Sequence, residues 1–176
     1  MKLSALYQIF LDCQSVTTDS RNCPDGSLFI ALKGESFNGN AFAKLALDSG
    51  CAFAIIDEIQ YAVEGDQRYI LVDDCLQTMQ QLANYHRRQL GTRVIGITGT
   101  NGKTTTKELI SSVLCQAHNV LYTLGNLNNH IGVPTTLLRL KPEHDLAVIE
   151  MGANHPGEIK FLCGIAERSE EHTSEL

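Results

Sequence analysis

The chain has 176 residues, of which 43% are hydrophobic, so it holds enough apolar material for a packed core, and disorder over the whole chain is excluded. Fourteen Lys and Arg against 20 Asp and Glu give a net charge of −6. This acidic balance argues against a nucleic-acid partner held by a broad basic surface. It leaves room for a small anion, which needs only a local positive site.

The first half of the chain alternates between helical and strand patterns. Apolar residues at helical spacing predict its helices, and short apolar runs predict its strands. In the second predicted helix Phe42, Leu45 and Ala46 should face inward, and Gly50 should end it. The expected elements are helix 3–13, turn 24–26, strand 28–32, helix 38–49, strands 51–56 and 69–72, and helix 74–90, which ends at Gly91.

The second half repeats the alternation. The expected elements are strand 93–97, loop 98–104, a helix to about residue 117, strand 119–122, polar loop 125–130, helix 133–140, strand 146–149 and helix 156–165. Strand and helix alternate throughout, which predicts an α/β protein with mostly parallel strands. The break at Gly91 divides it into domains at 1–90 and 91–167.

The cysteines and the N-terminus bear on location. No two of the six cysteines are spaced as Cys-x-x-Cys, so the sequence indicates neither a zinc knuckle nor a dense disulfide framework. We expect reduced thiols in a cytoplasmic protein. Residues 1–13 carry a single cation, Lys2, and make a poor signal peptide, while the longest apolar run, 51–56, is too short to cross a membrane.

The clearest chemical signal is the loop 98–104, Thr-Gly-Thr-Asn-Gly-Lys-Thr, between a strand and a helix. This context is the one that a phosphate-binding loop requires. Glycines permit unusual torsions and close approach, the helix N-terminus points N–H groups at an anion, and Lys103 adds a full positive charge. Thr104 offers a hydroxyl to Mg²⁺. The strict pattern would have glycine at position 97, where this chain has Ile97.

Further polar residues follow the predicted strands. Glu150 ends one strand, where it could hold Mg²⁺ directly or through water, or be merely an exposed strand-end carboxylate. His155 could contact metal, nucleotide or acceptor, or only a neighbouring turn. Asn126 and Asn129 lie in an amide-rich loop that could bind a sugar, a phosphate or a peptide, or simply form turns.

The first unit has two polar loops of its own. Ser20 and Arg21 combine a hydroxyl with a guanidinium suited to phosphate, and Lys33 follows the next strand. Either loop could equally be ordinary surface. The segment His86-Arg87-Arg88 is expected to be a solvated helix end that suits the helix dipole.

These motifs resemble the Mur ligases, the ATP-dependent amide ligases of bacterial cell-wall synthesis, in which the loop normally lacks the first glycine. Three segments resemble the MurF subfamily more narrowly. They are residues 19–34 (around Asp-Ser-Arg and Pro-Asp-Gly-Ser-Leu-Phe-Ile-Ala-Leu-Lys-Gly), 125–134 (Gly-Asn-Leu-Asn-Asn-His-Ile-Gly-Val-Pro) and 150–159 (Glu-Met-Gly-Ala-Asn-His-Pro-Gly-Glu-Ile). Position 38 is Asn where relatives usually have Asp.

The resemblance implies that residues 1–90 form the domain that holds a UDP-sugar and that 91–167 are the first part of the ATP-binding domain. The rest of that domain and a third domain would then be missing. Residues 168–176 break from the family pattern and look like a translated sequencing adapter, so we expect a non-native tail on a truncated gene model.

The implied reaction joins D-alanyl-D-alanine to UDP-N-acetylmuramoyl-tripeptide through an acyl phosphate, with ATP and Mg²⁺ as cofactors and a monomeric enzyme. Lys103 and Glu150 would be catalytic, and Thr104 and Glu150 would hold the metal. Thr98, Gly99, Thr100, Asn101, Gly102, Lys103 and Thr104 would bind ATP, and Ser20, Arg21, Lys33, Asn126, Asn129 and His155 would bind substrate. Two alternatives remain: another ligase of the family (third-residue-adding or folylpolyglutamate-type), and a binding protein for ATP or a UDP-sugar without catalysis.

Overall fold

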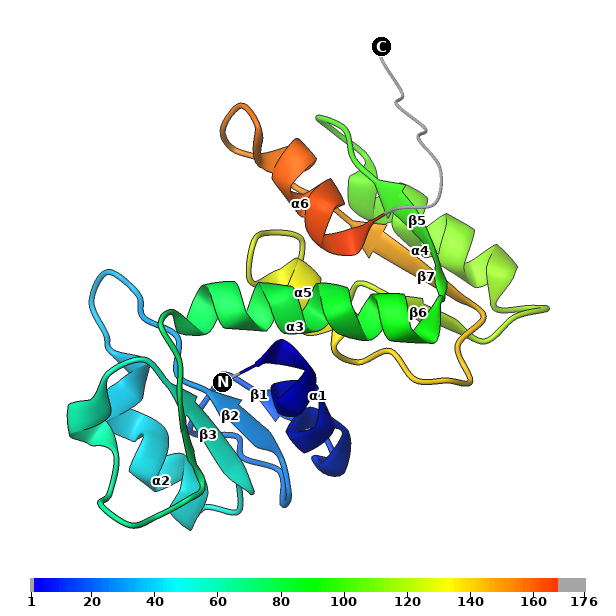
Figure 1. Cartoon of the computed structure of the whole chain (residues 1–176). Coiled ribbons are helices and arrows are strands. Elements are labelled where there is room, and N and C mark those ends of the chain that lie inside the picture. Colours follow the sequence, from blue (N-terminus) through cyan, green and yellow to red (C-terminus); the bar gives the residue numbers. More distant parts are fainter. Residues whose placement is uncertain (1, 168–176) are drawn as a thin grey trace. The chain divides into compact units, whose positions relative to one another are not determined.

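The computed structural model describes residues 2–167, so the predicted non-native tail lies outside the described residues (Figure 1). The chain divides into two compact units, Met1–Leu82 and Ala83–Leu176. The division falls inside helix α3 (Cys75–Leu90), just before the glycine at which the sequence places a domain break. No helix in residues 2–167 has both the length and the apolar character needed to span a membrane.

The first unit contains a four-stranded sheet in which every neighbouring pair of strands is parallel. Its order is β1-β2-β3-β4, and the strands are Val16–Thr17, Leu28–Ile30, Phe53–Ile56 and Tyr69–Leu71. All three residues of β2 are buried, as its uninterrupted apolar run predicts for a covered parallel strand. Only β1 was missed, because two residues are too few to show a pattern.

The helices of this unit correct one sequence expectation. They are α1 (Leu3–Asp12), the short 3₁₀ turns η1 (Gly39–Phe42) and η2 (Ile59–Tyr61), and α2 (Ala43–Asp48). The helix expected over 38–49 therefore begins as a 3₁₀ turn, which has only three residues per turn and rotates the following face. The predicted inward face was wrong for Phe42 and Leu45, which are 43% and 51% exposed, and right for Ala46. The α2 helix buries Ala43, Ala46 and Leu47.

The second unit is built on the parallel sheet β5-β7-β6. Its strands are Arg93–Ile97, Leu146–Glu150 and Val120–Tyr122, in that spatial order. The central strand β7 is buried at all five positions, including its final glutamate. Both sheets thus confirm the α/β class with parallel strands.

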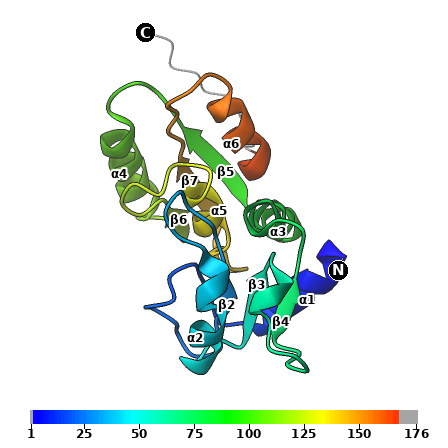
Figure 2. The same ribbon diagram turned by 90° about the vertical axis from the view of Figure 1, so that its left-hand side faces the viewer.

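Helices cover both faces of this sheet. Figure 2 shows α4 (Lys103–Leu114) on one side of β5 and β7 and α6 (Glu158–Ala166) on the other. The remaining helix, α5 (Gly132–Leu137), packs against α6. The predicted start of α6 at residue 156 was two residues early, because Gly157 has φ +90°, outside the helical region.

The histidine near the end of α3 is not solvated, contrary to the sequence expectation. His86 is 3% exposed, and its Nε2 lies 2.9 Å from the Leu140 carbonyl oxygen, to which it donates. Burial lowers the pKa of His86, and the hydrogen bond to Leu140 only partly opposes that effect. Desolvation by burial therefore favours the neutral form of this histidine.

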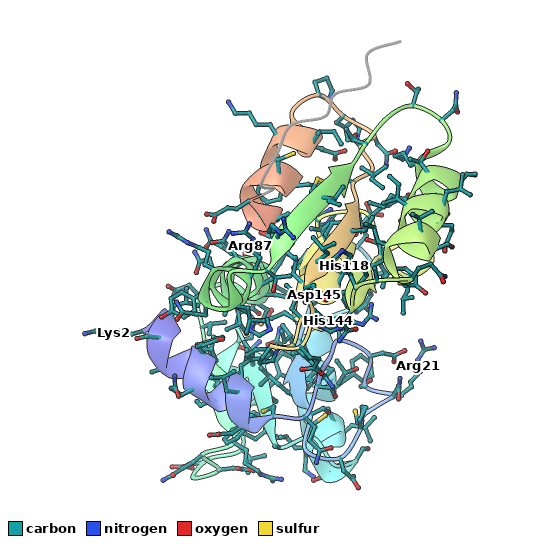
Figure 3. The ribbon with its side chains drawn as sticks, turned by 90° about the vertical axis from the view of Figure 1, so that its right-hand side faces the viewer. Lys2, Arg21, Arg87, His118, His144 and Asp145 are labelled. Atoms are coloured by element: carbon teal, nitrogen blue, oxygen red, sulfur yellow. The ribbon has the colours of Figure 1, made fainter. Side chains whose placement is uncertain are left out.

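This burial makes stability depend on pH. The unfolded chain protonates His86 near pH 6.5, whereas the folded chain does so only at lower pH, so the unfolded state binds more protons below about pH 6.5. We expect the free energy of unfolding to fall as the pH drops below that value, and His86→Gln to reduce this loss. Urea unfolding at pH 7.5 and pH 5.0 measures it. His118→Gln, at an exposed histidine 3.8 Å from Asp145 (both labelled in Figure 3), is the control and should keep the wild-type pH dependence.

Candidate active site

The predicted phosphate loop joins β5 to α4. Gly99 has φ +145° and Gly102 has φ +75°, both in a region that favours glycine over residues with a side chain. Gly102 stands immediately before the helix, and its carbonyl accepts the N–H of Thr106 at 2.8 Å. Both glycines are therefore required by backbone conformation, and the loop leads directly to a helix N-terminus.

The Lys103 side chain folds back over its own loop. Its Nζ donates to the Gly99 carbonyl oxygen at 2.8 Å and contacts that of Thr100 at 3.5 Å. These partners are neutral, so the ammonium charge remains available to an anion at the N-terminus of α4. The next residue, Thr104, is exposed in the first turn of the same helix.

Glu150 lies at the same edge of the sheet because β5 and β7 are parallel and in register. Its register partner is Ile97, the last residue before the loop, and the Met151 N–H donates to the Ile97 carbonyl at 2.8 Å. Glu150 is only 1% exposed, which rules out an exposed strand-end carboxylate. Its Oε1 accepts from Asn128 Nδ2 at 2.8 Å, whereas its buried Oε2 has no hydrogen-bond partner among the described residues.

That unpaired oxygen fits a cation. A buried carboxylate oxygen without a partner is costly, and a bound divalent ion would remove the cost. No group of three or more His, Cys, Asp or Glu in residues 2–167 is arranged to hold a metal. One carboxylate oxygen and one hydroxyl suit Mg²⁺, which typically takes one or two protein ligands and completes its shell with phosphate oxygens and water. Glu150 and Thr104 are the residues that would hold it.

A cavity of about 470 Å³ adjoins the loop and brings several predicted residues together. Four of them, Lys103, Asn126, Asn129 and His155, line it. The other lining residues are Asn128, His130, Gly152, Ala153, Asn154, Glu158, Phe161 and Leu162. The cavity is thus dominated by amides and imidazoles beside one lysine, a lining that can hydrogen-bond an anionic or peptidic ligand.

Within the amide loop, residues 125–130, the asparagines have different hydrogen-bond partners. Asn129 Oδ1 accepts the N–H groups of Ile131 and Gly132 at 3.1 and 2.8 Å, so it caps the start of α5. Asn128, which sequence reasoning did not single out, holds Glu150. The sequence carries no signal that separates Asn128 from its neighbours; in the structure its side chain packs against Gly152, where an added Cβ would lie 3.1 Å from it.

His155 lies in the loop before α6. The Glu158 carboxylate accepts the backbone N–H groups of Asn154 and His155 at 2.6 and 3.1 Å. These hydrogen bonds, with His155 and His130 nearby, lower the pKa of Glu158. The carboxylate therefore fixes the loop that carries His155 into the cavity.

In the first unit, Ser20 and Arg21 follow β1 and Lys33 follows β2, so both loops leave the carboxyl edge of one parallel sheet. Arg21 forms a two-pronged pair with Asp19, with N–O distances of 2.9 and 2.8 Å. The hydrogen bond from Arg21 lowers the pKa of Asp19 to about 2. The Arg21 side chain is 87% exposed and projects from the ribbon (Figure 3).

Lys33 is held by the acidic residues that follow β3. Its Nζ lies 3.1 Å from Asp57 Oδ1 and 3.5 Å from Glu58 Oε1. The Asp57 side chain, 3% exposed, also accepts from Asn40 Nδ2 at 2.8 Å and from the Cys75 N–H at 3.2 Å. Buried Asp57 thus anchors Lys33 at the edge of the sheet.

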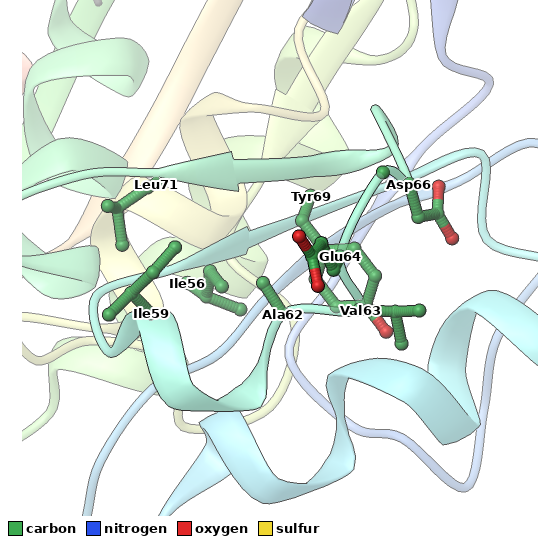
Figure 4. A pocket seen from close by; sticks show the side chains of 9 residues that line it. Ile56, Ile59, Ala62, Val63, Glu64, Asp66, Tyr69 and Leu71 are labelled. Atoms are coloured by element: carbon green, nitrogen blue, oxygen red, sulfur yellow. The ribbon is translucent and has the colours of Figure 1, made fainter.

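A second hollow of about 340 Å³ lies in the first unit beside β4, and it contains none of the predicted site residues. Figure 4 shows Ile59 and Leu71 together at one end, with the carboxylates of Glu64 and Asp66 toward the other. Ile59 and Leu71 are 63% and 47% exposed. Its lining combines apolar side chains with two carboxylates, and neither kind of group suits a phosphate.

Two family models match the chain. The Mur ligase family catalytic domain matches residues 12–87, and the Mur ligase middle domain matches residues 97–169, so together they account for most of the sequence. The chain belongs to the Mur ligase family. The phosphate loop and Glu150 lie within the part matched by the middle domain, and Ser20, Arg21 and Lys33 within the part matched by the other.

Relatives and solved structures agree with this membership. The chain is 47% and 46% identical to the UDP-N-acetylmuramoyl-tripeptide–D-alanyl-D-alanine ligases of Escherichia coli and Bacillus subtilis, over 86% of its own length and 33% of theirs. It superimposes with a TM-score of 0.84 and 36% identity on the Acinetobacter baumannii ligase for D-alanyl-D-alanine, covering 95% of this chain and 40% of that one. The MurF ligase of Thermotoga maritima in complex with ADP gives a TM-score of 0.77 and 32% identity over 89% of this chain and 36% of that one.

The chain thus spans about a third of the length of the curated Mur ligases that it matches. It carries the phosphate loop, the amide loop and Glu150.

The bond between Asn128 and Glu150 predicts a measurable effect on metal binding. Asn128→Leu removes the donor to Oε1 and leaves the Glu150 carboxylate free to turn. We expect the dissociation constant for Mn²⁺, used as a probe of a Mg²⁺ site, to rise about 10-fold or more in the presence of ADP. Electron paramagnetic resonance of free Mn²⁺ measures it. Asn154→Leu changes an amide of the same cavity without removing that donor, and an equal loss there would contradict the prediction.

Proposed function

We propose that this chain is part of an ATP-dependent ligase that joins D-alanyl-D-alanine to UDP-N-acetylmuramoyl-tripeptide in the cytoplasm, acting as a monomer with Mg²⁺. The observation that carries the proposal is that one sheet edge holds both a phosphate loop and a buried carboxylate whose second oxygen has no partner among the described residues. Lys103 of that loop also lines the amide-rich cavity. The relatives named for this reaction support the choice of substrates.

The reaction proceeds through an acyl phosphate. The terminal carboxylate of the tripeptide attacks the γ-phosphorus of ATP and releases ADP, and the amine of D-alanyl-D-alanine then displaces phosphate to form the amide. Phosphoryl transfer depends mainly on positioning and charge neutralisation. Lys103 neutralises charge on the transferring group, and the loop 98–104 holds the phosphates through backbone N–H groups.

Mg²⁺, when bound by Glu150 and Thr104, supplies further neutralisation of the phosphate oxygens. Asn126 and His155 line the cavity next to Lys103, where they orient the carboxylate of the substrate toward the γ-phosphate. Asn129 contributes by fixing that loop through its cap of α5. In the first unit, Ser20, Arg21 and Lys33 are proposed to face the uridine diphosphate.

Two alternatives predict different results. A third-residue-adding ligase of the same family is less well supported, because the diaminopimelate ligase structure is 20% identical with a TM-score of 0.52, a likeness in fold alone. The other alternative is a protein that binds ATP or a UDP-sugar without catalysis. None of the relatives and solved structures named above has a folylpolyglutamate-type name.

The deciding experiment compares binding with turnover in the full-length protein. Calorimetry measures ATP and UDP-N-acetylmuramoyl-tripeptide binding, and mass spectrometry follows the pentapeptide product formed with D-alanyl-D-alanine. We expect binding of both ligands and formation of product. Binding without product would favour the non-catalytic alternative. A parallel assay with UDP-N-acetylmuramoyl-L-alanyl-D-glutamate and 2,6-diaminopimelate, if it alone gave product, would favour the third-residue-adding ligase.

Lys103 gives the sharpest single variant. Lys103→Ala removes the cation of the phosphate loop and should lower kcat by roughly 10²–10³-fold, because a preorganised charge at the reacting phosphate is lost. The fold should survive, since the hydrogen bonds of Lys103 Nζ within residues 2–167 go to carbonyls of its own loop. Lys141→Ala, at an exposed lysine, is the matched control and should keep wild-type turnover. Wild-type kcat in Lys103→Ala would refute the assigned role.

A further inference from the structure

A buried lysine follows Lys103 by one turn of α4. Lys107 is 0% exposed, which is rare for this residue type. Its Nζ donates to the Thr123 carbonyl at 2.8 Å and lies 2.9 Å from Glu108 Oε1. An apolar side chain of similar size could fill such a space at lower desolvation cost, so the burial of an ammonium here calls for a specific reason.

The reason lies in its partner, Thr123, which is also fully buried. This residue follows β6, and its N–H extends the sheet by donating to the Val148 carbonyl at 3.1 Å. Its Oγ1 accepts the backbone N–H of Glu150 at 3.0 Å. One residue therefore joins the helix of the phosphate loop to the strand that ends in the metal-binding carboxylate.

The same residue begins the amide loop. Asn128, five positions further on, returns to Glu150 through the 2.8 Å bond to Oε1. Glu150 is thus held at two points, its backbone N–H by Thr123 and its side chain by Asn128. Lys107 belongs to α4, and its hydrogen bond to the Thr123 carbonyl connects Thr123 to this helix. Lys103 is the first residue of the same helix.

We propose that Lys107 and Thr123 are positioning residues that set the Glu150 carboxylate relative to the phosphate loop. The inference rests on the proposed function for the role of Glu150. Neither residue touches substrate; both act through Glu150. Loss of either one should therefore weaken the binding of a divalent cation more than it weakens the binding of metal-free nucleotide.

Four variants of the full-length protein test this. Thr123→Val removes the hydroxyl that accepts the Glu150 N–H and keeps the carbonyl for Lys107, whereas Thr123→Ser keeps both. Lys107→Met removes the ammonium at similar length. Glu108→Gln changes the 56%-exposed partner of Lys107 and serves as the control.

The readouts are Mn²⁺ affinity by electron paramagnetic resonance with a non-hydrolysable ATP analogue, affinity for the analogue without metal, and urea unfolding. We expect Lys107→Met and Thr123→Val to raise the Mn²⁺ dissociation constant about 10-fold, with metal-free affinity changed less than threefold. Thr123→Ser and Glu108→Gln should stay within about twofold of wild type. Lys107→Met and Thr123→Val both act through Glu150. The variant that combines them should therefore lose much less Mn²⁺ affinity than the two single fold-changes multiplied together.

Two results would overturn the inference: folded Thr123→Val with wild-type Mn²⁺ affinity, or equal losses in Thr123→Val and Thr123→Ser. Should Lys107→Met fail to fold, the Thr123 pair still decides. A wild type that binds Mn²⁺ and nucleotide but forms no amide would defeat the proposed function and leave this comparison intact. A wild type that holds no Mn²⁺ with the analogue would defeat both.

Discussion

The parallel pairing of β5 with β7 is the constraint on which the second unit depends. Its register sets Ile97 opposite Glu150, so the phosphate loop and the carboxylate leave the sheet at the same edge. A shift of one residue would turn the Glu150 side chain to the other face of the strand. The burial of all five residues of β7 opposes such a shift, because it would disturb apolar packing on both faces. The hydrophobic core thereby fixes the position of the Glu150 carboxylate relative to the loop that carries Lys103.

Around this edge, several polar groups are bonded within the fold. Asn129 caps α5, Glu158 fixes the loop before α6, and Thr123 accepts the Glu150 N–H. A hydrogen-bond network satisfied in this way is rigid, so any atom in it that lacks a partner has a well-defined position. Glu150 Oε2 is the buried one with no partner in the described chain. Because the neighbouring polar groups are bonded to one another, that oxygen is the buried position there that is open to a cation.

The sequence predicts most strands and the phosphate loop because contiguous apolar runs and glycine spacing are local signals. It fails where tertiary contacts decide. The amides Asn126, Asn128 and Asn129 look alike in sequence, and only the fold shows that Asn128 meets Glu150. Histidine and lysine side chains are usually expected at the surface. His86 and Lys107 are nevertheless buried, each against a carbonyl from a distant segment. Such partners, 54 and 16 residues away, leave no local pattern.

The two units present their cations in different ways. In the second unit, Lys103 contacts neutral carbonyls within the described chain, so its charge is uncompensated before a ligand binds. In the first unit, Arg21 is paired with Asp19, and Lys33 lies between Asp57 and Glu58, so these five groups sum to a charge of −1 (two cations against three anions). A diphosphate at that edge must draw on backbone N–H groups or displace a carboxylate, since the two cations alone do not make it positive. The carboxylates hold Arg21 and Lys33 in place by ion pairing. Because that pairing neutralises both cations, binding of an anion at this edge would need further groups besides these two side chains.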